Sequence, residues 1–549
     1  MMKMKKRFKQ WLAVICSLAL LTVSVPVSLA EEEAPAAGTS EAGEAPGEEG
    51  GYKEAPIVGE DVTRRSEDAK HFRRSDGSYT MVQYSTPVHY EKDGELLDID
   101  NTLTAGVEAD EATEGEAGLL AADSGATEVY GTEGNLFQVK FAKKSNGKFL
   151  MKLKQEDWSI YWSLTSPEKN KGTGQASNPA ESEDPLQLTK LTSGMRYNDI
   201  FADTDLQYIV TPTGVKENII VKKAQASYRY EFELKVKGVT LSPREDGGID
   251  VLKEGETEAS FVIPAPYMFD AAGAESTAAR YELEASKNGK KYTLRVIADA
   301  EWINAADRQF PVTIDPAIQL PRDYLTIHDA TVAYGTPSAA AITEMKTGWS
   351  SSKLFVGKYG TVGNMECAAI VQTDMNELKE ARILDAKLIM SYYTGNTTGM
   401  QVNAYKVTGS WTKGENFLYD TQVPGYNATP LDYSITPAGA TQNVTTTFDI
   451  TKAVQDWVTS GNNQGILLRS TSWQSGLVKY IASDTGGIAE DPQFIINYRD
   501  TKGLEPYWTY TTIAAGRNTA AYINNYNGAL TVASGIASAS GNVMPVSIQ

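Results

Sequence analysis

The sequence predicts an all-β protein, with a β-rich N-terminal domain followed by a β-sandwich that one helix covers. Large apolar residues alternate with polar or small ones in many short stretches, of which residues 158–164 are one example. Turn-forming pairs such as Asn288-Gly289 separate these stretches. A helical period is clear only at residues 450–457, where apolar side chains recur at the spacing of one helix face.

The first sixty residues predict export. Residues 1–30 combine a basic start, a short apolar run and small residues at 28–30, which is typical of a secretory signal peptide. The apolar run is too short to cross a bilayer comfortably, so we expect no membrane span after signal cleavage. Residues 31–60 are rich in Glu, Ala, Pro and Gly, and this composition predicts a disordered acidic linker.

Three further segments follow the linker. Residues 61–318 predict the N-terminal β domain, because short strands alternate there with turns. Residues 323–498 predict the β-sandwich, whose helix we expect to begin after Asp449 and to end at Gly461. Residues 499–549 hold strand and hairpin patterns with few apolar residues, and we interpret them as the start of a truncated domain.

Charge and cysteine content restrict the class of protein. The formal net charge is −19, which argues against non-specific binding to nucleic acid, because phosphate neutralisation needs basic patches. Cys367 is the one cysteine beyond the signal peptide, so no disulfide within the mature chain is possible. Proteins that Gram-positive bacteria export to the cell exterior usually lack cysteine pairs. We therefore expect a secreted, extracellular, cell-wall-associated protein of the Gram-positive type.

The search for catalytic motifs favours a protein that is not an enzyme. The three histidines, His71, His89 and His328, have no metal-binding or catalytic neighbours, and His89 is interpreted as a histidine on a strand surface. No zinc-protease, nucleophile-elbow or phosphate-loop motif occurs. Paired carboxylates remain an alternative, since a polysaccharide hydrolase needs only two of them.

Two groups of residues are candidates for binding. Asp199, Asp203 and Asp205 supply oxygen ligands suited to calcium, and the alternative is a solvated turn; no other cofactor is expected. Trp349 and Trp473 lie in polar, turn-like surroundings and are candidates for stacking on sugar rings, whereas Trp411 and Trp457 are assigned to the core.

Residues 65–318 resemble the N-terminal region of Rhs-type and wall-associated proteins of Gram-positive bacteria. Several motifs carry this resemblance in order: His71-Phe72-Arg73, Asp76-Gly77-Ser78-Tyr79, Pro264-Ala265-Pro266-Tyr267-Met268 and Pro311-Val312-Thr313-Ile314-Asp315-Pro316. The tail from Tyr507 to Ile548 is similar to the segment that leads into YD repeats.

Residues 323–498 resemble a DNRLRE domain, a jelly-roll-like module related to certain carbohydrate-binding modules. The resemblance rests on Asp329-Ala330-Thr331-Val332, on residues 449–457 and on Asn463-Gln464-Gly465-Ile466-Leu467-Leu468. The sequence departs at Ile481-Ala482-Ser483-Asp484-Thr485, where the family has a charged Arg-Glu signature, and this departure weakens the transfer of a ligand site.

These resemblances imply a function in surface display and adhesion. Such proteins are exported and very large, and their repeats form a shell that carries a variable C-terminal toxin. We therefore expect a non-catalytic module that binds polysaccharide or cell-wall glycan through the DNRLRE domain, carries a downstream Rhs shell and binds no nucleic acid. One alternative is a purely structural scaffold without a ligand, and another is a carboxylate-dependent polysaccharide hydrolase or lyase.

Overall fold

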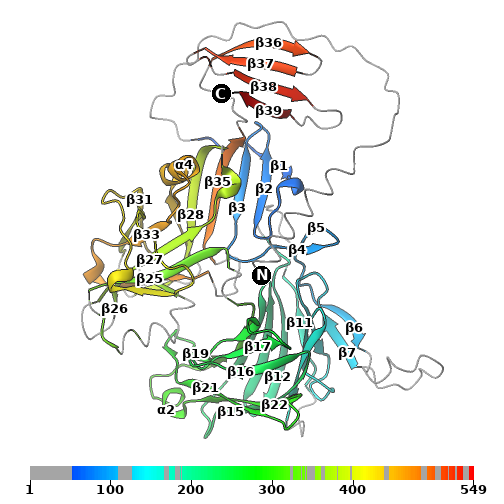
Figure 1. The fold of residues 1–549 in the computed structure, drawn as a ribbon. Helices are drawn as coiled ribbons and strands as arrows, with labels where there is room; N and C mark the ends of the chain where they lie inside the picture. Colours follow the sequence, from blue (N-terminus) through cyan, green and yellow to red (C-terminus); the bar gives the residue numbers. More distant parts are fainter. Residues whose placement is uncertain are drawn as a thin grey trace, which may run out of the picture. The chain divides into compact units, whose positions relative to one another are not determined.

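The structure is a computed structural model that describes residues 52–548 with internal gaps. The gaps are residues 109–126, 166–171, 180–185, 187, 322–324, 336, 340–341, 343–352, 360–364, 380, 396–398, 438–443, 484–490, 501–508, 517–518, 526–527, 529 and 536–542. The predicted signal peptide and most of the predicted linker lie outside the described residues. Within them the fold is all β, as predicted, with two short α-helices (Figure 1).

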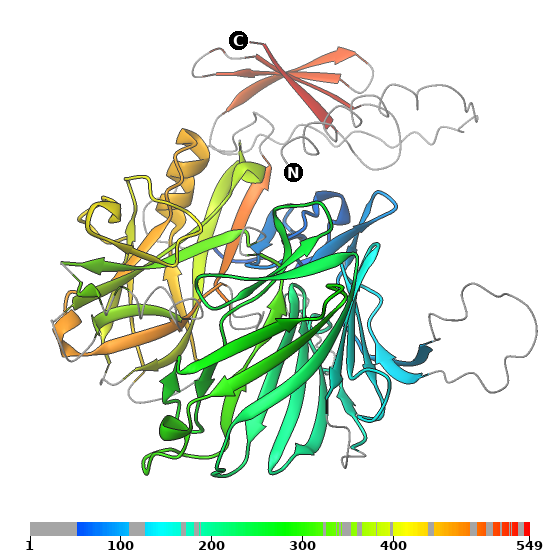
Figure 2. The same ribbon diagram turned by 60° about the horizontal axis from the view of Figure 1, so that its bottom comes forward.

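The first sandwich contains two antiparallel sheets, which we call sheet one and sheet two. Sheet one has the strand order β21 (Ala279–Ala285), β22 (Lys291–Ala298), β15 (Arg229–Lys237), β10 (Trp158–Leu164), β9 (Met151–Gln155), β8 (Gln138–Ala142), β7 (Thr127–Gly131) and β6 (Thr104–Glu108). The alternation within these strands places one side of sheet one against sheet two (Figure 2).

Sheet two is built mostly from hairpins. Its main order is β11 (Gln175–Ser177), β12 (Ser193–Phe201), β13 (Thr204–Thr211), β14 (Gly214–Val221), β24 (Ala317–Gln319), β18 (Ala259–Ile263), β17 (Ile249–Lys253) and β16 (Val239–Pro243). Strand β23 (Val312–Asp315) also pairs with β14, and β19 (Tyr267–Phe269) joins β23 to β20 (Glu275–Ser276).

Aromatic side chains hold the two sheets together. Phe261 of sheet two packs edge-on against Phe137, which directly precedes β8, and against Trp158 of β10, with ring centroids 5.6 and 5.5 Å apart. Such pairs stabilise a core by more than their buried area alone. The short helix α2 (Ala300–Ile303) follows β22, and Asp299 caps its first turn.

The second sandwich is one curled sheet that closes around its own core. Its main order is β1 (Ile57–Glu60), β2 (Ala69–Arg74), β3 (Tyr79–Gln83), β35 (Gln493–Asp500), β28 (Ala381–Gly395), β34 (Leu477–Ile481), β26 (Lys353–Tyr359), β27 (Met365–Thr373), β33 (Ile466–Arg469), β29 (Gln401–Lys406) and β31 (Asp432–Ile435). Three strands branch from it: β25 (Ile327–Tyr334), β30 (Phe417–Tyr419) and β32 (Val444–Asp449).

The N-terminal strands of the described chain belong to this second sheet. Strand β3 pairs with β35, with Tyr79 opposite Tyr498, and β1 and β2 extend the sheet. Residues 57–60 therefore form a strand where the sequence predicts the end of a disordered linker, because Ile57 packs against a small cluster that contains Phe72. Residues 79–83, predicted to lie in the domain 61–318, form a backbone ladder with a strand of the predicted segment 323–498.

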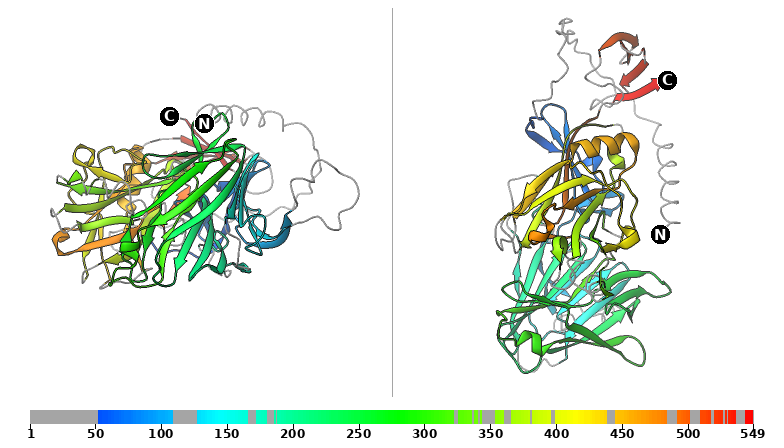
Figure 3. Two further views of the ribbon diagram at one scale, coloured as in Figure 1. Left: turned by 90° about the horizontal axis from the view of Figure 1, so that it is seen from below. Right: turned by 90° about the vertical axis from the view of Figure 1, so that its left-hand side faces the viewer.

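The predicted covering helix is confirmed as α4 (Thr451–Ser460). Ala453, Val454 and Trp457 are buried in the core of the second sandwich, and Figure 3 shows the helix lying along it. The carboxylate of Asp449 accepts a hydrogen bond from Thr451 N at 2.9 Å. Gly461 ends the helix in the left-handed conformation, with φ 69°.

The remaining elements are small. A hairpin joins β4 (His89–Lys92) to β5 (Glu95–Asp98), and a separate antiparallel sheet contains β36 (Tyr510–Gly516), β37 (Thr519–Asn524), β38 (Leu530–Gly535) and β39 (Val543–Ile548). Single 3₁₀ turns occur at η1 (Val62–Arg64), η5 (Asn376–Leu378), η6 (Asp420–Gln422) and η7 (Trp473–Ser475). Neither α-helix of the described residues has the length and apolar character that a membrane crossing requires.

Candidate functional site

Strands β31, β29 and β33 of the second sandwich carry a row of polar and aromatic side chains on one side of the sheet. The register of β31, β29 and β33 places Tyr433, Asn403 and Arg469 opposite one another. Residues that lie opposite in adjacent strands point to the same side of a sheet. Leu468, the neighbour of Arg469, lies in the main core, so this row is on the other side of the sheet. We call it the β31–β33 row. On that side Leu467 and Tyr405 belong to a smaller apolar cluster, and Asn403 is buried.

The end of the row at β31 is open to solvent. Tyr433 is 56% exposed, and Ile435, two residues along the same strand, is 63% exposed. Gln401 lies opposite Ile435 and is also exposed. An exposed aromatic ring beside amide groups is a common platform for ligands with one flat apolar side and several hydroxyl groups.

Arg469 is held firmly at the other end of the row. Its guanidinium donates two hydrogen bonds to the Glu366 carboxylate, at 2.6 and 3.0 Å, and lies 4.2 Å from the centre of the Tyr334 ring. It also donates to the Tyr426 hydroxyl. The hydrogen bonds with Glu366 raise the pKa of Arg469 above its usual range, so this cation is permanent and fixed in place.

A chain of hydrogen bonds fixes the polar groups between the two ends. Gln401 Nε2 donates to Asn403 Oδ1 at 2.8 Å, and Asn403 Nδ2 donates to the Tyr405 hydroxyl at 3.0 Å. The Tyr405 ring packs against the Tyr426 ring, with centroids 5.2 Å apart. Asn403 and Tyr405 are buried, so this chain of contacts holds the exposed Gln401 amide in place from below, which lowers the entropic cost of binding.

None of the residues in the β31–β33 row was selected from the sequence. Tyr433 and Ile435 alternate with the polar residues Asp432 and Ser434, and this alternation is the one sequence signal that points to them. It predicts a strand with one apolar side. It does not say whether that side is buried or exposed, because this depends on pairing with β29.

The two tryptophans predicted to stack on sugars have different outcomes. Trp473 begins η7, four residues after Arg469, and is half-buried. Trp349 lies outside the described residues. The assignment of Trp411 and Trp457 to the core is confirmed, since both are buried and Trp411 Nε1 donates to Gln464 O at 2.9 Å.

The three aspartates predicted to bind calcium each face a lysine. Lys222 Nζ lies 2.5 Å from Asp199 and 2.8 Å from Asp205, and Lys223 Nζ lies 2.9 Å from Asp203. Burial alone would raise the pKa of Asp205, but the hydrogen bond from Lys222 keeps it below its usual value. Among the residues that the structure describes, no group of three or more His, Cys, Asp or Glu side chains is placed to hold a metal. Calcium binding stays a prediction, and the ion would have to displace Lys222.

The histidines of the N-terminal strands lie in buried contacts. His71 Nδ1 is 2.9 Å from the Tyr498 hydroxyl, and its Nε2 is 3.1 Å from a Glu377 oxygen. The expected surface position of His89 is wrong, because this side chain, at the start of β4, is fully buried. Its Nδ1 bonds the carbonyl of Ser66 at 2.6 Å, and its Nε2 faces the Asp98 carboxylate at 3.5 Å.

One pair of carboxyl groups lies inside the first sandwich. Glu217 of β14 accepts a hydrogen bond from the Tyr208 hydroxyl at 2.6 Å, and Asp315 of β23 is its acidic neighbour. Burial raises the pKa of Glu217 to about 7 and also raises the pKa of Asp315. Both side chains are about as buried as the surrounding core, so a polysaccharide chain does not reach this pair.

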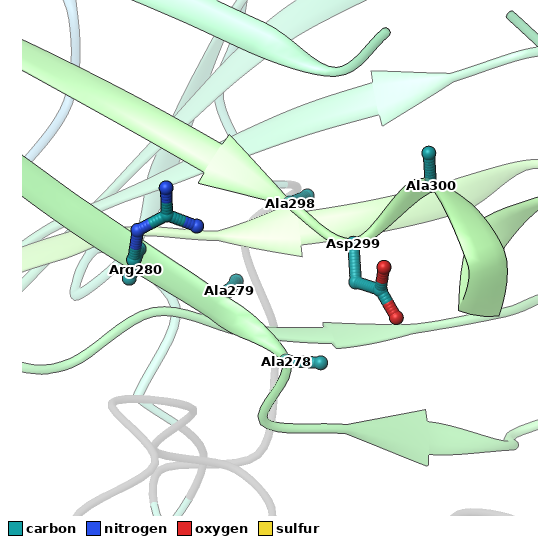
Figure 4. A pocket seen from close by; sticks show the side chains of 6 residues that line it. All are labelled: Ala278, Ala279, Arg280, Ala298, Asp299 and Ala300. Atoms are coloured by element: carbon teal, nitrogen blue, oxygen red, sulfur yellow. The ribbon is translucent and has the colours of Figure 1, made fainter. Parts of the chain in front are cut away.

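A cavity of about 410 Å³ opens beside α2 in the first sandwich. Its lining consists of Ala278, Ala279, Arg280, Ala298, Asp299 and Ala300. Figure 4 shows that the Arg280 and Asp299 side chains do not converge on one point. Asp299 accepts from the backbone N–H groups of Glu301 and Trp302, at 3.2 and 3.3 Å, and Arg280 donates to Glu282 at 3.3 Å, so both charged side chains of this lining already have partners.

Comparison with known proteins identifies relatives over most of the chain. The chain is 25% identical over 533 residues to the tRNA nuclease WapA of Bacillus subtilis (strain 168), which covers 92% of this chain and 21% of that protein. It is 24% identical over 462 residues to the tRNA(Glu)-specific nuclease WapA of Bacillus subtilis subsp. natto, covering 82% of this chain and 18% of the relative. A Geobacillus stearothermophilus protein named Wall-associated protein is 23% identical over 215 residues, which is 39% of this chain and 75% of that protein. The relatives are WapA-type wall-associated proteins.

Two other comparisons add little. No protein-family profile matches the chain. Among solved structures, the N-terminal domain of the Streptococcus gordonii adhesin Sgo0707 aligns over 84% of this chain, but its TM-score of 0.11 is too low to indicate a shared fold.

The relatives correct one prediction and support another. The prediction that the protein is not an enzyme is wrong, because three relatives carry the name of a tRNA nuclease. The chain spans about a fifth of the length of these relatives. The resemblance to wall-associated proteins is confirmed, whereas the DNRLRE resemblance stays a prediction.

Proposed function

We propose that this chain belongs to a secreted, cell-wall-associated Rhs-type toxin protein with tRNA nuclease activity, and that its second sandwich binds polysaccharide. The relatives support the wall association and the nuclease activity through their names. The polysaccharide function rests on one observation, the β31–β33 row with exposed Tyr433 at one end and the fixed Arg469 cation at the other.

The chemistry of the row suits a sugar polymer. The Tyr433 ring offers a flat apolar surface for the hydrogen-bearing face of a pyranose ring. The exposed amide of Gln401 can form hydrogen bonds with hydroxyl groups. The Arg469 side chain is 26% exposed and already donates to Glu366 and Tyr426, so only its remaining N–H groups can serve a ligand. The row crosses three strands, which lie about 4.8 Å apart, so it extends over roughly two sugar units.

A binding experiment on immobilised cell-wall polysaccharide tests this proposal. Tyr433→Ala removes the exposed ring, and we expect at least a tenfold loss of affinity. Trp473→Ala tests the residue that the sequence selected, and we expect a smaller loss because Trp473 is half-buried and lies outside the row. Val107→Ala is the control, since Val107 is 64% exposed on β6 of the first sandwich. Unchanged binding of the Tyr433 variant would refute the glycan site and favour a purely structural scaffold.

Nuclease activity needs its own test. The product of the complete gene is incubated with purified tRNA, and we expect cleavage at a defined position. If the tRNA stays intact while the same preparation still binds the wall, the nuclease part of the proposal fails and the glycan part stands.

A further inference from the structure

Sheet one of the first sandwich carries a dense set of lysines on the side that faces away from sheet two. One row of the register contains Lys291, Lys235, Tyr161, Lys152 and Lys140, from β22 to β8. The next row contains Lys237, Ser159 and Lys154. The neighbours of these residues along the strands, such as Leu234 and Leu153, are in the core. We call the six lysines the lysine face: Lys140, Lys152, Lys154, Lys235, Lys237 and Lys291.

The lysine face has a positive charge in a strongly acidic chain. Neither row contains an acidic residue. Two acids reach it from neighbouring positions: Glu108 contacts Lys140 and Lys152 at 2.5 and 2.6 Å, and Glu233 contacts Lys291 at 3.0 Å. At this end of the sheet six lysines against two acids leave a local excess of positive charge, whereas the chain as a whole has a net charge of −19. Farther along the same side, Glu231, Glu282 and Glu284 are paired with Arg229, Arg280 and Arg295.

Four of these lysines are exposed and extend the charge across the sheet. They are Lys154, Lys235, Lys237 and Lys291. The hairpin turn between β21 and β22 adds exposed Lys287 and Lys290 at the same end of the strands. Because adjacent strands lie about 4.8 Å apart, the ammonium groups form a two-dimensional array rather than a single point of charge.

Tyr161 occupies the centre of the lysine face. The Nζ atoms of Lys152 and Lys235 lie 4.7 and 5.7 Å from the centre of its ring, one from each neighbouring strand. These cation–π contacts hold two ammonium groups in place on either side of the ring. The face therefore has fixed cations around a half-buried aromatic centre.

We propose that the lysine face binds an extended phosphodiester polymer of the cell wall, such as a polyol phosphate chain. Phosphate recognition follows from the array of lysines, because ammonium groups bind phosphates as point charges and release counterions from a polyanion. The choice of a wall polymer rests on the wall association proposed above. This surface lies on the first sandwich and is independent of the β31–β33 row.

The face suits a polymer without bases better than single-stranded RNA. Proteins that bind single-stranded nucleic acid combine basic grooves with exposed aromatic rings on which successive bases stack. Within the two described rows, Tyr161 is the single aromatic residue, and lysines on both neighbouring strands contact its ring. Successive bases would find no series of stacking partners.

The experiment compares two sets of lysine substitutions in the full chain. The test variant carries Lys154→Gln, Lys235→Gln, Lys237→Gln and Lys291→Gln. The control variant carries the same number of substitutions at exposed lysines elsewhere, Lys53→Gln, Lys92→Gln, Lys379→Gln and Lys452→Gln. The net charge of the chain changes equally in both, so only the position of the lost charge differs. Far-ultraviolet circular dichroism shows that both variants are folded.

The probes are poly(glycerol phosphate) and a single-stranded RNA with the same number of phosphates. We expect the unmodified chain to bind poly(glycerol phosphate), with a log K that falls by about 3 per unit of log salt, since each of four phosphate contacts contributes about 0.7. The test variant should lose at least tenfold in affinity and show a flatter salt dependence, and the control should keep both. Equal losses in the two variants would overturn the proposal, as would tighter binding to the RNA. Tyr433→Ala should not change this binding, which separates the lysine face from the glycan site.

Discussion

Glu217 is expected to make the first sandwich less stable as the pH rises. Its carboxyl group is buried, and burial raises its pKa from 4.5 to about 7, a net value that includes a lowering by the Tyr208 hydrogen bond and a smaller increase from nearby Asp315. Between these two values the unfolded chain releases the proton and the folded chain keeps it. The folded state then binds more protons than the unfolded state, so the free energy of unfolding falls with rising pH. The effect begins near pH 4.5 and is complete somewhat above pH 7.

The size of the effect follows from the shift. A change of about 2.5 pKa units corresponds to about 3 kcal/mol, because one unit is about 1.4 kcal/mol. Glu217→Gln removes the ionisation and keeps an oxygen that accepts the hydrogen bond from Tyr208. We therefore expect the variant to match the unmodified chain at pH 5 and to exceed its stability at pH 8 by up to about 3 kcal/mol.

Urea unfolding followed by tryptophan fluorescence measures this difference. Trp158 and Trp162 are buried in the same sandwich and report its unfolding. Unfolding curves at pH 5, 6, 7 and 8 give the free energy for both proteins. Glu245→Gln, at an exposed position, is the control and should show no pH-dependent gain. If Glu217→Gln destabilises the protein equally at all four values, the carboxyl group is not held neutral in the folded state and the reasoning is wrong.

Three further predictions concern other buried positions. Burial alone would lower the pKa of His89, but hydrogen bonds with Asp98 and Glu60 raise it above 6.5. The charged His89 therefore stabilises the fold below pH 6.5, and this stabilisation is lost as the pH rises through the higher pKa of the folded state. The loss of stability caused by His89→Gln, measured by urea unfolding, should shrink from pH 6 to pH 9. Gly465→Ala should cost more than about 1 kcal/mol in thermal unfolding, because a Cβ atom at φ 95° would lie 2.5 Å from Val371 O, while Gly414→Ala, with φ 94° and open space, should cost less. Trp457→Ala should cost about 3–5 kcal/mol by the same measurement, since it leaves a cavity between α4 and the sheet, and Thr459→Ala on the exposed side of the helix should have little effect.

Local patterns in the sequence predict the elements well. The spacing of Ala453, Val454 and Trp457 identifies both the helix and its buried side, because a helix repeats every 3.6 residues and one side must face the core. The alternation in residues 158–164 likewise predicts strand β10 and its core-facing residues. In both cases the decisive information lies within about ten residues.

Pairing between distant segments is not visible in the sequence. The predicted domains 61–318 and 323–498 separate β3 from β35, although these two strands pair. No local pattern near residues 79–83 indicates a partner strand more than 400 positions away. Asp205 was misread for a related reason: its partner Lys222 directly follows the next strand, β14, and pairing of β13 with β14 is what brings the two side chains together. Tyr433 and the lysine face were missed because their exposure depends on which strands lie beside them.

The pairing of β3 with β35 also sets the order in which the molecule can form. Thr80 and Asn497 are 417 positions apart, and their side chains share a hydrogen bond of 2.6 Å. In a chain synthesised from its N-terminus, β3 therefore lacks its partner β35 until the whole first sandwich and most of the second have been made. During that interval the unpaired edge of β3 can pair with strands of other molecules. A chaperone that covers this edge would raise the yield of native protein. Closing so long a loop costs only slightly more entropy than closing one half its length, so the delay is a burden on kinetics rather than on final stability.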